Sequence, residues 1–230
     1  MSRCIARSRR SASPIGANDV KTDELINMLS EDSAVRFRLD HALTLAIVVA
    51  ILLAGAMFFT LMGLRPDIEA ALTSLRFVFK LAVATVLFLL AANLMVRIGR
   101  PGARVLPWKL ALLLVPVLVA VSVLAELVVL PVGDWKAQMI GHNAHECLSL
   151  IPLLAIGPLA SFILALRQSA PENPGRAGAV AGLAAGGIAA AFYASNCTDD
   201  SPLFVALWYT LAIGIVSCAG YLAGRRWLVW

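Results

Sequence analysis

Charged residues are scarce in this chain: Asp, Glu, Lys and Arg make up 14% of its 230 residues, whereas 60% are hydrophobic. A soluble domain of this size needs a larger share of polar surface. The hydrophobic residues occur in long blocks rather than in a stripe of helical spacing, so most helices are expected to be apolar on all sides. The composition therefore predicts an all-α protein that crosses a membrane several times.

The chain also lacks any CxxC motif, because its four cysteines are widely spaced. This spacing argues against a zinc finger or a thioredoxin-like site. The loops between the hydrophobic blocks are short and leave no room for a soluble catalytic domain, so no enzymatic activity is expected. The net charge of +5 is attributed to topology signals rather than to nucleic-acid binding.

Six hydrophobic blocks are long enough to cross about 30 Å of hydrocarbon. Together they predict a transmembrane bundle over residues 41–226, followed by a short tail at 227–230. The blocks cover residues 42–64, 71–96, 108–130, 147–166, 177–196 and 202–224.

The charges of the loops alternate along the chain. Basic residues precede the first block, fill the second and fourth loops and follow the last block, as Arg36, Arg38, Arg97, Arg100, Arg104, Lys109, Arg167, Arg176, Arg225 and Arg226. The other loops are mainly acidic and carry only Arg65 and Lys136 as cations. The positive-inside rule then places both termini in the cytoplasm and the acidic loops outside.

The only sizeable segment outside the blocks is the N-terminal one. Residues 1–18 are expected to be a disordered basic extension, and residues 19–40 a cytoplasmic docking segment with a short amphipathic helix at 19–38. Asp19 or Thr22 can cap this helix, and acidic residues suit its first turn. The residues expected to bind a partner are Thr22, Asp23 and Glu24, together with Leu25, Ile26 and Leu29, which form one apolar edge of the helix.

Three ionisable residues interrupt the second and third blocks. Lys80 and Glu126 lie at equal sequence distances from the basic residues Arg97 and Lys109, so they are expected at the same depth and can form an ion pair. Arg76, one turn away from Lys80, can join them. A structural ion pair is the usual role of such residues, and a proton or ion relay is the functional alternative.

The same depth count places Cys147 and Cys197 together at the outer ends of the fourth and fifth helices. The outer face is oxidising, so a disulfide can persist there. Polar neighbours could complete a site for a thiophilic ion such as zinc or copper, although the spacing is not a standard zinc signature. These accessory candidates are His142, His145, Glu146, Asp199 and Asp200. The residue types alone leave open whether the two cysteines form a redox or metal site or have a structural role. They also leave open whether the polar neighbours are ligands or ordinary polar residues of the loops.

Several segments resemble a bacterial family, the NrsF-type negative regulators of extracytoplasmic-function sigma factors. The resemblance runs from about residue 20 to the end, and is densest in its last third. It is carried by KTDELINMLSED at 21–32, LRFVFKLA at 75–82, CLSLIP at 147–152 and AFYASNCTDDSPLFVALWYTLAIGIVSCAGYLAGRRWL at 191–228.

This resemblance implies an anti-sigma factor of the bacterial inner membrane that takes part in a stress response. Its N-terminal segment would hold an extracytoplasmic-function sigma factor, and a metal or oxidant acting on Cys147 and Cys197 would release it. Two rival interpretations stay open on the residues alone. One is a small metal or ion transporter that uses Lys80, Glu126 and the His/Cys cluster, and the other is a membrane thiol oxidoreductase.

Overall fold

The computed structural model describes residues 22–100, 103–169 and 171–228, with side chains from His41 onward, and it contains no strand among them. The expected all-α class is confirmed for these residues. The chain divides into two units, residues 1–35 and 36–230. In the first unit the described residues are helical, and the second unit is the bundle.

The helices of the bundle follow one another with short connections. In chain order they are α1 (Thr22–Leu61), α2 (Ile68–Leu72), α3 (Leu75–Ile98), α4 (Leu106–Leu112), α5 (Leu114–Val129), the 3-10 helix η1 (Val132–Asp134), α6 (Trp135–Ile140), α7 (Ala144–Leu166), α8 (Pro174–Ala194), α9 (Pro202–Phe204), the π-helical turn η2 (Val205–Tyr209) and α10 (Thr210–Trp227).

Six helical stretches of these elements are long and apolar enough to cross a membrane, which confirms the predicted number of spans. They are His41–Leu61, Leu75–Ile98, Leu106–Val129, Val132–Leu166, Pro174–Ala194 and Pro202–Trp227. The third span is broken at Leu113, between α4 and α5. Pro116 explains this break, because it has no N–H to donate to the carbonyl of Leu112.

The predicted docking segment is described only in part. Its residues from Thr22 to Asp40 belong to α1, the same helix that forms the first span. Residues 1–21, which include the predicted disordered extension and the alternative cap Asp19, lie outside the described residues. So do the side chains of the predicted docking residues Thr22, Asp23, Glu24, Leu25, Ile26 and Leu29. Their role in docking stays a prediction.

Helix α8 lies at the centre of the bundle. In its most apolar stretch 72% of the residues are buried, compared with 6% for the third span, α4 and α5. Small residues allow this: a side chain at Gly178 would collide with the backbone of Gly220 and Gly224 on α10. The hydroxyl of Ser217 on α10 also donates to the carbonyl of Ala179, at 3.1 Å. The glycines on this face of α8 therefore form a close packing interface with α10.

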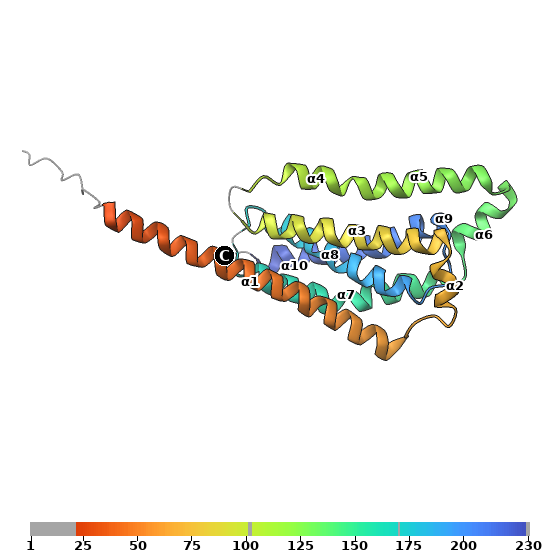
Figure 1. Ribbon diagram of the computed structural model, residues 1–230, viewed down its shortest axis with the longest axis horizontal. Coiled ribbons are helices and arrows are strands. Elements are labelled where there is room, and N and C mark those ends of the chain that lie inside the picture. Colours follow the sequence, from red (N-terminus) through yellow and green to blue (C-terminus); the bar gives the residue numbers. More distant parts are fainter. Residues whose placement is uncertain (1–21, 101–102, 170, 229–230) are drawn as a thin grey trace, which may run out of the picture. The chain divides into compact units, whose positions relative to one another are not determined.

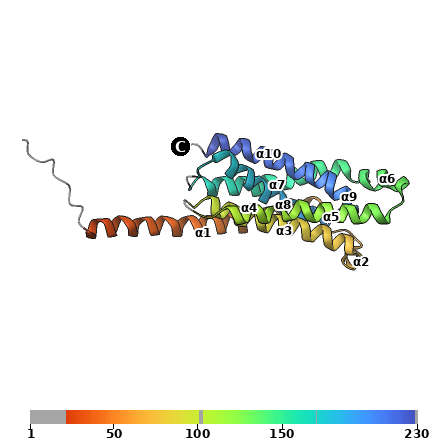
Figure 2. The same cartoon turned by 90° about the horizontal axis from the view of Figure 1, so that it is seen from above.

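The six spans place successive loops at opposite ends of the bundle. We call the end formed by residues 62–67, 130–143 and 195–201 the thiol end, and the end formed by residues 99–100, 103–105, 167–169 and 171–173 the arginine end. Figure 1 shows α2, α6 and α9 together at the thiol end, and α4 and α5 as the outermost layer on one side. The turned view also places α2 and α6 at that end (Figure 2). Which end faces the cytoplasm stays a prediction from the charges.

Candidate functional site at the thiol end

The two candidate cysteines lie together at the thiol end. Cys147 is in the first turns of α7, and Cys197 is in the loop 195–201 that connects α8 to α9. Both side chains are buried, at 0% and 2% exposure, and their thiols are near enough to interact electrostatically. Both are free thiols. The third described cysteine, Cys218, is exposed on α10, away from this site.

Asp199 ties the two cysteine-bearing segments together. One of its carboxylate oxygens, Oδ2, accepts hydrogen bonds from the backbone N–H groups of His142 and Asn143, both at 2.8 Å, and from the Asn143 side-chain amide at 3.0 Å. These donors lie at the N-terminus of α7, where the helix dipole favours a negative charge. Burial acts to raise the pKa of Asp199, but the hydrogen bonds from Asn143 and His142 outweigh it and lower that pKa.

Gly141 makes this approach to Asp199 sterically feasible. Its φ of 60° is in the region that favours glycine. A Cβ atom at this position would lie 2.8 Å from Oδ2 of Asp199, and it would also collide with the ring of Phe204. The turn before α7 therefore depends on a residue without a side chain.

Lys80 of α3 holds the same loop from the other side. Lys80 is only 1% exposed. Its ammonium group donates hydrogen bonds to the backbone carbonyl of Cys197 at 2.8 Å and to that of Asp199 at 3.2 Å. It also forms an ion pair with Asp200 at 2.5 Å. The carbonyl of the sensing candidate Cys197 is therefore bonded directly to a cation on a neighbouring helix.

The structure pairs Lys80 and Glu126 differently from the sequence-based expectation. Among the described residues, Lys80 pairs with Asp200, and Glu126 pairs with Arg76 at 3.4 Å. The other Glu126 oxygen accepts from the Ser201 hydroxyl at 2.8 Å and from the Leu203 N–H at 3.0 Å. The expected Lys80–Glu126 ion pair is therefore wrong. Counting residues gave similar depths, but it could not show that residues 197–203 lie between the two side chains.

Arg65 is a site residue that the sequence reasoning missed. Its guanidinium group binds both carboxylate oxygens of Asp67 at 2.7 Å, Asp200 at 3.1 Å and the Cys197 carbonyl at 3.4 Å. The hydrogen bonds from Arg65 lower the pKa of Asp67 to about 2, and those to Asp67 raise the pKa of Arg65. The available signal in the sequence was a single arginine in mainly acidic loops, because arginine forms strong hydrogen bonds with carboxylates. In the structure the residue is only 8% exposed, and its anionic partners compensate its buried charge.

Two buried tyrosines enclose the thiols on the side of α8 and η2. The rings of Tyr193 and Tyr209 are 5.9 Å apart, and the Tyr193 hydroxyl donates to the Asn143 carbonyl at 3.4 Å. The Tyr209 hydroxyl borders Cys197, but it has no hydrogen-bond partner among the described residues. Tyr209 ends the π-helical turn η2, a type of turn that is frequent at functional sites.

The remaining metal-ligand candidates do not gather around the thiols. His145 and Glu146 are exposed on the first turn of α7, and the side chain of His142 is 96% exposed, with its ring 3.6 Å from Asp199. Among the described residues, no three His, Cys, Asp or Glu side chains are placed to hold a metal ion. The arrangement is a pair of thiols fixed by a network of charges.

The environment of Cys197 controls its reactivity. Burial raises the pKa of the Cys197 thiol, although the positive charge of Lys80 acts in the opposite direction. The thiol is thus protonated at neutral pH, and a thiolate is the species that reacts with oxidants and binds metals. The loop 195–201 therefore has to open, at least locally, before Cys197 reacts readily.

Comparisons with known proteins give a consistent result. The family model NrsF, described as negative regulator of sigma F, matches residues 29–230. A probable anti-sigma-F factor NrsF from Azospira oryzae is 29% identical over 214 residues, with 92% of this chain and 100% of the relative covered. The anti-sigma-F factor NrsF from Caulobacter vibrioides is 31% identical over 215 residues, with the same coverage. No solved structure shows significant similarity to this chain.

Proposed function

Because the chain belongs to the NrsF family of negative regulators of sigma F, we propose that it is a membrane anti-sigma factor that holds an extracytoplasmic-function sigma factor inactive. The protein is regulatory, and its partner is a sigma factor in the bacterial cytoplasm. We place the chain in the inner membrane, because this membrane borders the cytoplasm, where the sigma factor acts.

The proposed docking element is the segment 19–40. Its apolar residues Leu25, Ile26 and Leu29 fall at helical spacing and fit a hydrophobic groove. Asp23 and Glu24 supply negative charge on the same turn of helix. We assign docking to this segment because the loops that connect the spans are short.

The proposed orientation puts the arginine end in the cytoplasm and the thiol end outside. The charges of the loops support it. Arg65 is the main exception at the thiol end, and it is neutralised by Asp67 and Asp200. A cation bound in this way is a weak topology signal, so the alternation of the remaining charges is clearer than the sequence alone suggests.

The proposed stimulus is an oxidant or a thiophilic metal ion that acts on Cys147 and Cys197. With an oxidant that accepts two electrons, the two S–H groups lose two protons and two electrons and one S–S bond forms. With a metal ion, each thiol loses a proton and binds the ion through its sulfur. The ion then takes its remaining ligands from solvent.

One observation carries this proposal: Cys197 lies where three other parts of the bundle converge. Its own carbonyl binds Lys80 of α3 and Arg65 of the α1–α2 loop, and its neighbour Asp199 holds the N-terminus of α7. A change at the thiol therefore alters contacts with all three. Because packed interiors respond by discrete rearrangement rather than by gradual deformation, such a change can reach the first span and the segment that precedes it.

Affinity capture tests the partner. The full-length chain in detergent is incubated with a lysate of a bacterium that encodes it, and bound proteins are identified by mass spectrometry. We expect a sigma factor to be retained by the wild type and lost in the variant L25A/I26A/L29A. The matched control L106A/L110A/L113A removes three exposed leucines of the third span and should retain it. Failure of the wild type to retain any sigma factor would contradict the proposal.

A further inference from the structure

A pocket at the arginine end has no part in the site described above. It lies between α3, α4 and α8 and has a volume of about 420 Å³. Four of the residues that line it are cationic, Arg97, Arg100, Lys109 and Arg176, and one is acidic, Glu172. The pocket therefore has an excess of positive charge.

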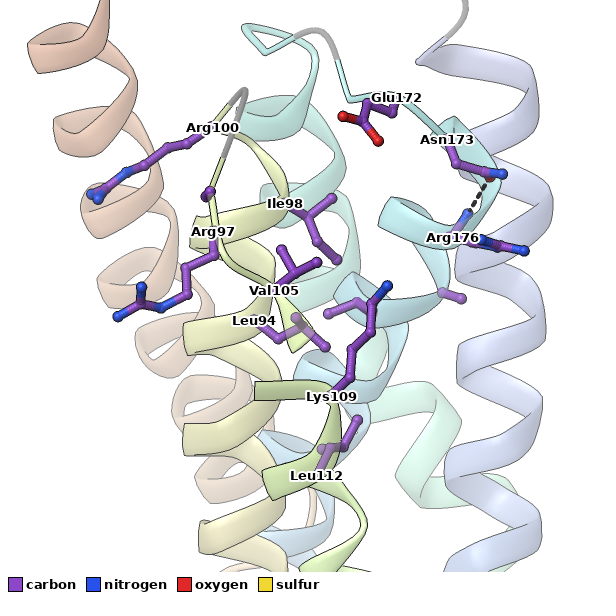
Figure 3. Close-up of a pocket in the computed structure, with 13 residues that line it drawn as sticks. Leu94, Arg97, Ile98, Arg100, Val105, Lys109, Leu112, Glu172, Asn173 and Arg176 are labelled. Carbon is purple, nitrogen blue, oxygen red and sulfur yellow. Dashed lines mark hydrogen bonds between the residues drawn. The ribbon is translucent and has the colours of Figure 1, made fainter. Parts of the chain in front are cut away.

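Two of these cations are available to a ligand. Among the described residues, neither the ammonium of Lys109 nor the guanidinium of Arg176 has a hydrogen bond or an ion pair, and both residues are exposed. The Arg97 guanidinium instead stacks on the ring of Trp108, at 4.5 Å. In Figure 3 the Arg97 and Arg100 side chains extend to one side of Lys109, and the Arg176 side chain extends to the other side.

The pocket is apolar below this charged mouth. Its walls continue into Leu94, Leu112 and Val180, and Figure 3 shows Leu112 below Lys109, on the side away from Glu172 and Asn173. The outer surface of α4 is also apolar, with Leu106 and Leu110 at 65% and 58% exposure. The pocket thus has cations at its entrance and apolar walls below them, and it borders the third span, which is the least buried of the six. This combination matches an amphiphile that carries a negative charge.

We propose that this pocket binds an anionic phospholipid, with its phosphodiester group between Lys109 and Arg176 and an acyl chain along Leu94, Leu112 and Val180. The lipid then bridges α4 and α8 and holds the third span against the rest of the bundle. A flat acidic protein surface fits less well, because the two cations border a concave opening. The proposal does not depend on the identity of the sigma factor.

Lipid binding to the full-length chain in detergent tests this proposal. The probe is pyrene-labelled phosphatidylglycerol, whose binding is followed by energy transfer from tryptophan, since Trp108 lies beside the pocket. Each surface cation contributes about fivefold to the binding of an anionic lipid, so K109Q/R176Q should bind roughly 25-fold more weakly. The control R167Q/R226Q removes the same charge from exposed residues outside this pocket, and should change binding less than about twofold.

Further variants and ligands separate loss of charge from misfolding, and a lipid from free phosphate. The charge-preserving K109R/R176K should restore binding, because it keeps both cations at the mouth of the pocket. Labelled phosphatidylcholine should bind more weakly than phosphatidylglycerol, and inorganic phosphate should not compete. Equal loss in K109Q/R176Q and in the control, or competition by inorganic phosphate, would overturn the lipid assignment. So would a K109Q/R176Q variant that loses the sigma factor but still binds phosphatidylglycerol normally, because the surface would then be a protein-docking one.

Discussion

Replacing Lys80 by Met should make Cys197 react faster. The substitution keeps the length of the side chain but removes its ion pair with Asp200 and its hydrogen bonds to the carbonyls of Cys197 and Asp199. Removal of one partner from a buried ion pair costs about 3–5 kcal/mol. Arg65 still binds Asp200 and the Cys197 carbonyl, so we take the lower end, about 3 kcal/mol, for the loss of stability of the closed loop.

The two effects of this substitution on the thiol oppose each other. A destabilisation of about 3 kcal/mol raises the population of the open loop roughly 150-fold. Loss of the nearby positive charge acts against the reaction, because Lys80 lowers the pKa of the Cys197 thiol and so favours the thiolate. Where closing is faster than the reaction, the rate follows the open population. The net expectation is therefore a rate higher than in the wild type, by less than about 150-fold.

The assay is alkylation of Cys197 by a maleimide, in a chain whose other cysteines are replaced by serine. The matched control is R76K, one turn earlier on the same helix, because it keeps a cation beside the buried Glu126 and leaves the hydrogen bonds of that carboxylate to Ser201 and Leu203 in place. R76K should leave the rate within about twofold of the wild type, because the charge beside Glu126 is preserved and the contacts of Lys80 with the loop are untouched. An unchanged rate in K80M, or an equal acceleration in both variants, would show that the contacts of Lys80 do not hold the loop closed.

Three further predictions concern the thiol end and the core. D199N should lower the stability of the bundle by about 2 kcal/mol, measured by thermal unfolding. Because the pKa of Asp199 is lowered in the folded state, the difference in stability from the wild type should persist between pH 7 and pH 5. It should disappear as the pH falls through that lowered pKa. G220A should cost about 3 kcal/mol, because the new methyl group meets the backbone of α8, whereas G214A on the same helix has open space and should be close to neutral; equal unfolding midpoints would contradict the packing argument. C197S should abolish release of the sigma factor by oxidant or metal, measured by retention on the captured protein, while C218S, which alters an exposed thiol on α10, should respond normally.

The hydrophobic blocks were sufficient to predict the spans. Their number and approximate limits follow from composition, because a membrane requires long apolar helices whatever their neighbours are. Gly178, Gly182 and Gly186 recur every fourth residue along α8, a spacing typical of a packing face, since only small residues allow two backbones to approach closely. Counting residues along the helices likewise placed Cys147 and Cys197 at the same end.

The partners of the charged side chains could not be predicted in the same way. Depth along a helix is fixed by residue number, but the direction of a side chain depends on rotation and on which loop inserts between helices. This is why Lys80 was assigned to Glu126 rather than to Asp200, and why Arg65 was missed. The role of Asp199 in holding the N-terminus of α7 depends on a turn at Gly141, which no local pattern indicated.

The central claim is that a change at the two thiols lowers the affinity for the sigma factor. The most direct test is the dissociation constant of the captured sigma factor for the full-length chain in lipid nanodiscs, measured before and after treatment with the two-electron thiol oxidant diamide or with cadmium ions. We expect the dissociation constant to rise roughly 5- to 150-fold in the wild type, the usual range of allosteric coupling, and to stay unchanged in C147S/C197S. Equal weakening in the wild type and in C147S/C197S, or no weakening in either, would contradict it.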